Sequence, residues 1–266
     1  MRKFSISLLV AFVATLSAIH GQNSDSRKEA ERIWELAIQA KGGREKLYAV
    51  ENMLVSSRFT VKHGVFKKKD ARYDQFFVFP SKLWIWNDAL PEGVGLLINT
   101  INLETQTVYF LYPTDLKNPL RKNNEIYESD KQYFRYTQLL FLLESRWQKP
   151  KIIGYRIDFI GSQKYDVVET VLDNGMHDIF FDQKTHLPVR IVFHYRGTLS
   201  DKTTNYIYKL EDYQTIDGIT LPTKLYAPTA GAAEYLSFQI NVEYDKSIFE
   251  KPPTAEAGSE AWKLKK

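Results

Sequence analysis

The side chains best suited to chemistry gather in one predicted hairpin. His177, His186 and His194 lie there together with Asp178 and Asp182. Imidazole and carboxylate groups serve general acid–base catalysis and bind zinc, so this hairpin is the first place to look for a catalytic or metal site. Whether it can work as one depends on which of these side chains share a face of the sheet.

The register of the hairpin decides which side chains meet. If residues 182 and 187 pair across the turn, residue 177 faces residue 192, and His194 is the diagonal neighbour of His177 on the same face. Diagonal side chains lie about 7–8 Å apart, which could bracket a metal ion. A slip of one residue destroys the arrangement. Because the sequence offers no obvious third ligand and no H-E-x-x-H motif, we expect turn and surface histidines and no metal site.

Motifs for other chemistry are missing from the sequence. It contains no Cys, no G-x-S-x-G elbow, no Walker loop and no G-x-G-x-x-G fingerprint. We therefore expect no catalytic residue, no cofactor and no enzyme activity; an enzyme that uses the His177/His194 hairpin is the weaker alternative. The 36 basic and 32 acidic residues nearly balance, and acidic Asp70 directly follows the run Lys67-Lys68-Lys69, so we expect no nucleic-acid partner.

The first residues have the pattern of a secretory signal peptide. Arg2 and Lys3 supply the positive start, residues 5–19 form a short apolar stretch, and the small residues Ala18 and Gly21 lie near its end. This stretch is shorter than the about 20 apolar residues that span a bilayer comfortably. We expect cleavage after Gly21 and export to the periplasm, with an uncleaved N-terminal anchor as the alternative.

Two helices are predicted among many strands. A capping box at residues 26–29 precedes an amphipathic stretch that ends at Gly42-Gly43. A second helix is expected at residues 130–146, where apolar side chains extend nearly all round, so this helix must be covered on more than one side. Residues 113–124 are predicted to form a polar loop. The remaining pattern predicts antiparallel strands at residues 53–63, 65–79, 82–87, 94–101, 105–112, 152–160, 165–172, 176–181, 187–196, 205–213, 219–226 and 234–244.

Several of these strands are apolar on both faces. The stretch from Tyr109 to Tyr112 is an example, and 14% of all residues are aromatic. A sheet that is wetted on one side should alternate apolar and polar residues instead. Either both faces are covered, as in an ordinary filled core, or one face holds an apolar ligand.

Several of these segments together resemble a known family. They are Ala40-Lys41-Gly42-Gly43 with Leu47 and Val50 after it, Phe79-Pro80-Ser81-Lys82-Leu83-Trp84, the hairpin from Phe181 to Arg190, the segment from Tyr213 to Pro222, and Ile248-Phe249-Glu250-Lys251-Pro252. Over nearly all of the mature chain they look like the outer-membrane lipoprotein-sorting-protein-like group of the LolA/LolB superfamily. These are turn and strand signatures, so they are more specific for the fold than for an activity.

The resemblance implies a mainly β (α+β) fold. It would be a strongly curved antiparallel sheet forming an incomplete β-barrel, with an N-terminal helix and a central helix closing the open side. In such proteins the concave face holds acyl chains, and the helix at residues 130–146 would belong to the lid or plug. Arg58, on the first strand, is the candidate for a gating arginine. The candidates for lining the apolar cavity or lid are Trp84, Trp86, Tyr109, Leu111, Phe134, Leu140, Phe141 and Leu143.

We expect three parts along the chain: a signal peptide at residues 1–21, a half-barrel domain at residues 22–250 and a flexible tail at residues 251–266. The expected function is non-catalytic binding or transport of a lipid acyl chain or a lipidated protein in the periplasm. We expect a monomer that meets a transient partner of the envelope. The alternative from another class is an envelope structural or interaction protein with the same fold and a filled core.

Overall fold

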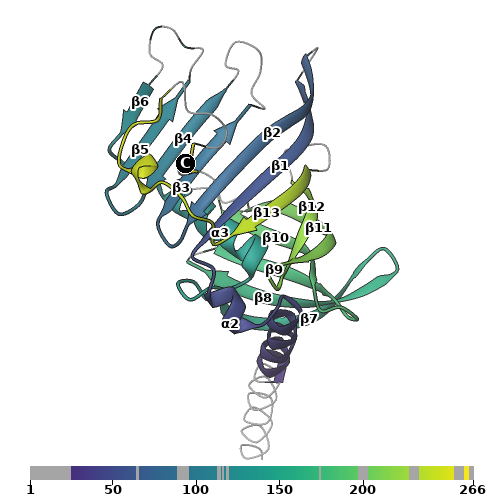
Figure 1. Ribbon diagram of the computed structural model, residues 1–266. Coiled ribbons are helices and arrows are strands. Elements are labelled where there is room, and N and C mark those ends of the chain that lie inside the picture. The colour runs from purple at the N-terminus through teal and green to yellow at the C-terminus, as the bar shows by residue number, and fades with distance from the viewer. Residues whose placement is uncertain are drawn as a thin grey trace, which may run out of the picture. The chain divides into compact units, whose positions relative to one another are not determined.

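The computed structural model describes residues 25–63, 66–88, 96–112, 115, 117, 120–173, 175–196, 203–227, 234–254 and 261–263. The expected signal peptide at residues 1–21 lies outside them. Within the described residues, hydrogen bonds link 13 strands into one antiparallel sheet that does not close, in the order β6-β5-β4-β3-β2-β1-β13-β12-β11-β10-β9-β8-β7 (Figure 1). The expected fold class, mostly β with an open antiparallel sheet and a few helices, is confirmed.

The chain folds into two compact units. Unit 1 comprises residues 1–40 and 150–206, and unit 2 comprises residues 41–149 and 207–266. The sequence pattern predicted one domain over residues 22–250 and did not indicate this division. None of the helices in the described part of the chain is long and apolar enough to cross a membrane.

Unit 2 contains most of the strands. In chain order its elements are α2 (Arg44–Tyr48), β1 (Asn52–His63), β2 (Phe66–Val78), β3 (Lys82–Asn87), β4 (Leu97–Asn102), β5 (Thr107–Leu111), β6 (Leu120–Asn123), α3 (Glu128–Leu142), β11 (Thr203–Ile216, which begins in unit 1), β12 (Ile219–Tyr226), β13 (Glu234–Ile240) and the 3₁₀ helix η1 (Lys246–Phe249). The prediction of a loop at residues 113–124 was wrong at its end, because β6 pairs with β5 there. This strand has four residues and no apolar alternation, so it left no strand signal in the sequence.

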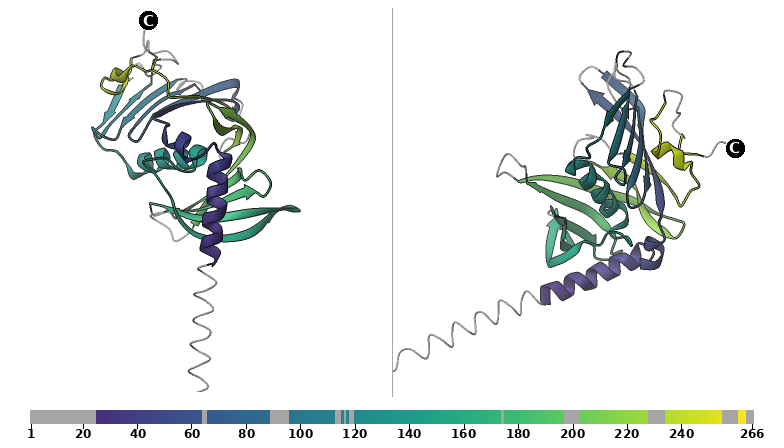
Figure 2. Two further views of the ribbon diagram at one scale, coloured as in Figure 1. Left: turned by 60° about the horizontal axis from the view of Figure 1, so that its bottom comes forward. Right: turned by 90° about the vertical axis from the view of Figure 1, so that its left-hand side faces the viewer.

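Helix α3 covers one face of the unit 2 sheet, which we call the α3 face (Figure 2). Successive side chains of a strand point to opposite faces, so the register assigns Met53, Phe77 and Leu83 to this face. The ring of Phe134 on α3 lies 5.6 Å from that of Phe77. The ring of Phe141 lies 5.2 Å from that of Phe238 on β13. These aromatic contacts fix α3 on the sheet at both of its halves.

The C-terminal segment covers the opposite face, which we call the C-terminal face (Figure 2). Trp262 is only 2% exposed, and its ring stacks on Phe76 at 5.2 Å. The backbone N–H of Asp245 donates to the carbonyl of Trp262 at 2.8 Å. Trp262 therefore packs as a core residue, although it lies in the segment predicted to be a tail. The buried cluster on this face consists of Leu54, Phe76, Trp84, Ile98, Leu111, Phe249 and Trp262.

Unit 1 is a four-stranded antiparallel sheet with one helix packed on it. The strands are β7 (Lys151–Ile160), β8 (Gln163–Leu172), β9 (Gly175–Asp182) and β10 (Pro188–Arg196). The helix spans residues 25–40 and buries its apolar stripe; the ring of Trp34 lies 6.2 Å from that of Phe181. Ser26, expected as the N-cap, lies inside this helix instead. Its hydroxyl bonds the backbone N–H and C=O of Tyr155 and so attaches the helix to β7.

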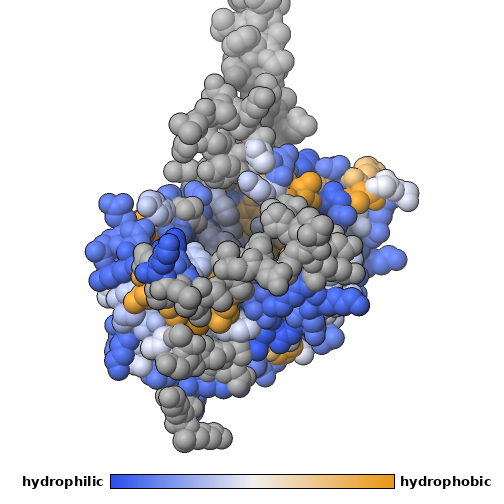
Figure 3. All heavy atoms as spheres, turned by 90° about the horizontal axis from the view of Figure 1, so that it is seen from above, coloured by the Kyte–Doolittle hydropathy of each residue, from blue (hydrophilic) through white to orange (hydrophobic). Residues whose placement is uncertain are grey.

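The exposed surface is largely polar. On the face drawn in Figure 3 most coloured residues are hydrophilic, and apolar ones occur in small groups. Among the described residues, the most exposed large hydrophobic side chains are Tyr235 at 61%, Phe159 at 60% and Tyr127 at 58%. Such scattered exposure is ordinary for a folded protein and does not by itself mark a binding surface.

Candidate functional site

The candidate site is the α3 face of unit 2 together with α3, because apolar surface and buried polar groups meet there. Helix α3 ends at Leu143, whose φ of 65° and N–H bond to the carbonyl of Leu139 close the last turn. Just beyond it, the fully buried carboxylate of Glu144 accepts hydrogen bonds from Arg44 at 2.5 Å and from Tyr48 at 3.2 Å. This end of α3 is therefore tied to α2 by a buried charged group.

Two further hydrogen bonds hold the same end of the helix. The hydroxyl of Ser145 donates to the side chain of Gln138 at 3.0 Å. The side-chain amide of Gln148 donates to the backbone carbonyl of Arg135 at 2.8 Å. Since breaking a buried hydrogen bond leaves a desolvated polar group behind, the C-terminal half of α3 is its fixed end.

The other end of α3 meets the sheet through a tyrosine cluster, which we define as Ser57, Tyr73, Gln75, Tyr133 and Glu234. The hydroxyls of Tyr73 and Tyr133 lie 3.0 Å apart, and the side-chain amide of Gln75 donates to the hydroxyl of Tyr133. Ser57 pairs with Tyr73 in the register and donates to Glu234. The first turns of α3 thus rest on neutral hydrogen bonds, while its other end rests on an ion pair.

Burial keeps the two tyrosines of this cluster uncharged at neutral pH. Desolvation raises the pKa of Tyr73 to about 12, and it raises the pKa of Tyr133 well above its ordinary value. The hydroxyl of Tyr133 is shielded even though the residue as a whole is 38% exposed. Desolvation also raises the pKa of Glu234, against the opposing effect of the Ser57 hydrogen bond. A neutral donor–acceptor group beside an apolar face suits the polar end of an amphipathic ligand.

The structure divides the eight residues that the sequence analysis proposed for the cavity or lid. Phe134 and Phe141 contact the α3 face, and Leu140 and Leu143 are buried at 7% and 0% exposure. The register places the other four, Trp84, Trp86, Tyr109 and Leu111, on the C-terminal face. Trp84 and Leu111 lie there beneath Trp262, and Arg58 lies on this face as well. Ligand binding by these residues stays a prediction, and the two groups cannot line one side of the sheet.

The sequence analysis missed the tyrosine cluster. Tyr73, Gln75 and Phe77 alternate on β2, so their shared face could have been recognised. Nothing in the sequence indicates that this face is the one against which Tyr133 packs. It also missed Glu144. The only sequence feature that could have indicated a buried carboxylate here is the position of this lone acidic residue directly after five apolar residues, Leu139 to Leu143.

The placement of His177 and His194 as diagonal neighbours on one face, which the sequence made conditional on the pairing of residues 182 and 187, was wrong. The pairing across the turn is as expected, with the N–H of Asp182 bonded to the carbonyl of Leu187. The register then shifts between Pro188 and Arg190, so that His177 pairs with Phe193. One extra residue moves His194 to the other face.

His177 is a packed core residue in unit 1. It is 1% exposed, and its ring meets that of Phe193 edge-on at 5.0 Å. Desolvation, followed by repulsion from His194, lowers the pKa of His177 to about 4, so the ring is neutral at pH 7. The described residues contain no group of three or more His, Asp or Glu side chains that could hold a metal ion.

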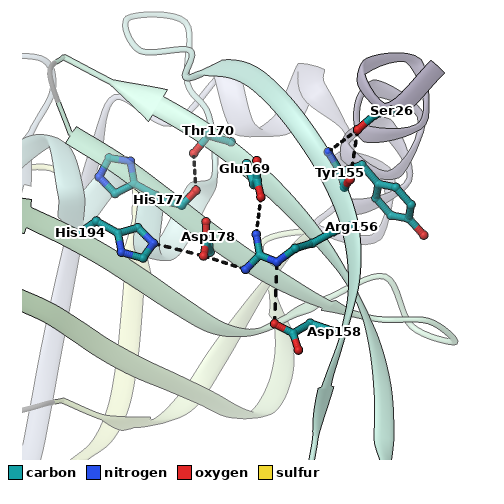
Figure 4. Close-up of polar contacts among 9 residues, drawn as sticks. All are labelled: Ser26, Tyr155, Arg156, Asp158, Glu169, Thr170, His177, Asp178 and His194. Carbon is teal, nitrogen blue, oxygen red and sulfur yellow. Dashed lines mark hydrogen bonds and ion pairs between the residues drawn. The ribbon is translucent and has the colours of Figure 1, made fainter. Parts of the chain in front are cut away.

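His194 instead joins a charged network on the face of β7 to β10 that points away from His177 (Figure 4). Its Nε2 lies 3.1 Å from Asp178, which also pairs with Arg156 at 2.8 Å. Arg156 reaches Glu169 at 2.5 Å as well. Three strands are thus linked by one guanidinium. The arrangement is that of a partly exposed ion-pair network, which contributes modestly to stability.

Comparison with known proteins gives structural matches. No family model and no curated protein matches the chain. A solved LolA superfamily protein from Nitrosomonas europaea has 13% identity and a TM-score of 0.49, with coverage of 84% of this chain and 97% of the other. A DUF1329 family protein from Desulfovibrio piger has 10% identity and a TM-score of 0.47, with coverage of 88% and 99%.

A third match is a domain from Vibrio parahaemolyticus assigned as an outer membrane lipoprotein-sorting protein. It has 10% identity and a TM-score of 0.47, with coverage of 83% of this chain and 97% of the other. At such low identity these likenesses do not extend to function.

Proposed function

We propose that this protein is an exported, non-catalytic carrier of a lipid acyl chain or a lipidated protein, and that unit 2 holds the chain on its α3 face. The observation that supports this most is the nature of α3, an apolar helix seated on an apolar sheet face. Phe134, Leu139, Leu140, Phe141 and Leu142 are each at most 7% exposed. The first half of this helix, which carries Phe134, can act as a removable insert that a hydrocarbon chain replaces, while the second half stays in place.

The energies allow this exchange. Each buried CH₂ contributes roughly 0.8 kcal/mol, so a chain of ~16 carbons gains on the order of 10 kcal/mol before the costs of binding. Exposing a buried Phe side chain costs about 1.5–3 kcal/mol. A gain of this size can offset the exposure of Phe134, so a ligand can shift the first half of α3 between two positions. The fixed end at Glu144 would then serve as the pivot.

Native mass spectrometry tests the proposal on protein purified from a membrane-containing host. Co-purified lipid, together with saturable uptake of a fluorescent fatty acid, is the expected result. A measured mass equal to that of the protein alone, together with no uptake of the fatty acid, would contradict the carrier proposal. That outcome would favour the alternative, an envelope interaction protein with a filled core. The complete burial of the apolar side of α3 is also consistent with this alternative.

Phe134→Asp should increase fatty-acid uptake, because it drives the first half of α3 off the sheet face that the ligand is to cover. The substitution places a carboxylate against the rings of Phe77 and Phe79, and burying a charge among apolar rings is expensive. Phe159→Asp is the matched control, because Phe159 is 60% exposed. Uptake is measured by fluorescence, and folding by circular dichroism. Equal uptake by both folded variants would show that the α3 face is not the binding surface.

Tyr133→Phe tests the lifting of α3 without disturbing the core. The variant keeps the ring but loses the hydroxyl that bonds Tyr73 and Gln75. Two hydrogen bonds at ~1 kcal/mol each predict faster fatty-acid association, by roughly tenfold or more. Tyr127→Phe is the control, because Tyr127 directly precedes α3 and is 58% exposed. An unchanged rate in stopped-flow measurements would mean that this end of α3 does not move.

A further inference from the structure

Polar side chains gather at one end of the α3 face. In the register, Gln75 on β2 lies opposite Ile85 on β3, which lies opposite Asn99 on β4, so all three point to this face (Figure 1). Gln75 belongs to the tyrosine cluster, and Asn99 lies two strands away, at roughly 10 Å between Cα atoms. The next row of side chains on this face is apolar; it consists of Met53, Phe77, Leu83, Ile101 and Val108. An amphipathic ligand can therefore place its headgroup at the row of Gln75 and its hydrocarbon chain on the apolar row.

Asn99 carries a buried acceptor that lacks a donor. The residue is 8% exposed, and its Oδ1 has no hydrogen-bond partner among the described residues. Folded proteins seldom leave a buried polar atom unpaired, because the atom has lost its hydrogen bonds to water. A ligand that donates an O–H or N–H to this oxygen would remove the cost.

The tyrosine cluster loses a hydroxyl when the first half of α3 lifts. The hydroxyl of Tyr133 bonds that of Tyr73 and accepts from the side-chain amide of Gln75, which is only 6% exposed. Tyr133 belongs to α3, so lifting the helix takes this hydroxyl away from Tyr73 and Gln75. A hydroxyl of the ligand can make the same two bonds, because it both donates and accepts, as the phenol does.

Ionised headgroups fit this polar end less well. The only carboxylate of the tyrosine cluster is Glu234, and the cluster has no Lys or Arg to pair with an anion. The cation in the row of Asn99 is Arg121 on β6, which pairs with Asp115 at 3.1 Å. A carboxylate cannot donate to Asn99, and an ammonium group cannot accept from Gln75. An uncharged headgroup with hydroxyls can do both.

We infer that the α3 face binds an acyl chain whose headgroup is uncharged and carries two hydroxyls, as in a monoacylglycerol. One hydroxyl takes the place of that of Tyr133 between Tyr73 and Gln75, and the other donates to Asn99. This inference rests on the proposed function, since it describes the ligand that displaces the first half of α3.

The test offers the protein an equimolar mixture of lipids with the same chain length: monopalmitoylglycerol, methyl palmitate, palmitate and hexadecylamine. Methyl palmitate keeps the ester but lacks both hydroxyls, while palmitate and hexadecylamine carry opposite charges. Native mass spectrometry measures how much of each lipid the protein holds, so the preference is read from one sample.

Asn99→Leu removes the acceptor from the α3 face. Gln239→Leu is the matched control, because it removes an exposed amide from the C-terminal face of β13. Without lipid, Asn99→Leu should melt at or above the wild-type temperature, since leucine needs no hydrogen bond at this buried position. Asn99→Ala also lacks the acceptor and adds no bulk, so it is the second variant should the leucine disturb folding.

Each hydroxyl contact is worth roughly tenfold in affinity. The wild type and Gln239→Leu should therefore prefer monopalmitoylglycerol over methyl palmitate by roughly a hundredfold, and the Asn99 variants by roughly tenfold. Equal binding of these two lipids by the wild type, tighter binding of palmitate or hexadecylamine, or an unchanged preference in the Asn99 variants would overturn the inference. A wild type that holds none of the lipids would contradict the proposed function itself.

Discussion

Replacing Lys41 by methionine should raise the free energy of unfolding at pH 7 by a few kcal/mol. Lys41 is completely buried, and its Nζ has no hydrogen-bond partner among the described residues. The ring of Tyr213 lies below the Nζ, 5.7 Å from it to the ring centre. Burial lowers the pKa of Lys41 to about 7, and each unit of pKa is worth about 1.4 kcal/mol. Methionine fills the same space without the cost of burying an amine.

The same lysine predicts a pH dependence. The unfolded chain has the ordinary lysine pKa of 10.5, so between pH 7 and pH 10.5 it binds a proton that the folded protein does not bind. Stability should therefore rise with pH across this window, and the full penalty should persist below pH 7. The Lys41→Met variant should lack this rise. Both proteins contain the same titrating tyrosines, so the effect of the tyrosines cancels when the stability of the variant is subtracted from that of the wild type at each pH.

Urea unfolding at a series of pH values measures both effects. Lys209→Met, at an exposed position of β11, is the control and should behave as the wild type. Parallel curves for wild type and Lys41→Met would show that the amine of Lys41 is solvated or paired in solution.

Trp262→Ala should lower the free energy of unfolding by about 3–5 kcal/mol, the usual cost of truncating a large buried aromatic side chain. The indole stacks on Phe76 and covers the cluster that contains Trp84 and Leu111. Its loss should also expose that apolar face to the dye ANS. Phe159→Ala, an exposed aromatic in unit 1, should change the unfolding energy by less than about 0.5 kcal/mol.

Guanidinium unfolding followed by fluorescence checks this prediction, with Trp262→Phe expected to recover most of the loss. If Trp262→Ala is as stable as the wild type and binds no ANS, the segment is undocked in solution. Residues 251–266 would then be the flexible tail that the sequence suggested.

The strands were predictable because their signals are local. Turn residues such as Asp217-Gly218 and alternating stretches such as β12 mark a strand by themselves. The end of the first helix at Gly42 was predictable for the same reason, since its φ of 117° suits glycine. Strand β6 was missed because one leucine followed by three polar residues becomes a strand only by pairing with β5.

The site was less predictable because it depends on long-range choices. Phe76 and Phe77 look alike in sequence, yet one packs under Trp262 and the other under Phe134. Only the positions of α3 and of the C-terminal segment decide which face is which. The register predicted for the hairpin of His177 was wrong because the strand contains one extra residue near Pro188. No local pattern in the sequence indicates this extra residue.

Among the described residues the open sheet ends in β6 and β7, and edge strands can invite other chains to add to them and grow fibrils. Strand β6 is four residues long and exposes Arg121 and Lys122. Strand β7 is longer, but its register breaks between Ile152 and Gly154, and it carries Arg156 and Asp158. Short length, charge and a bulge are the features that deter edge-to-edge polymerisation. An unclosed sheet can thus persist at high concentration without seeding aggregates.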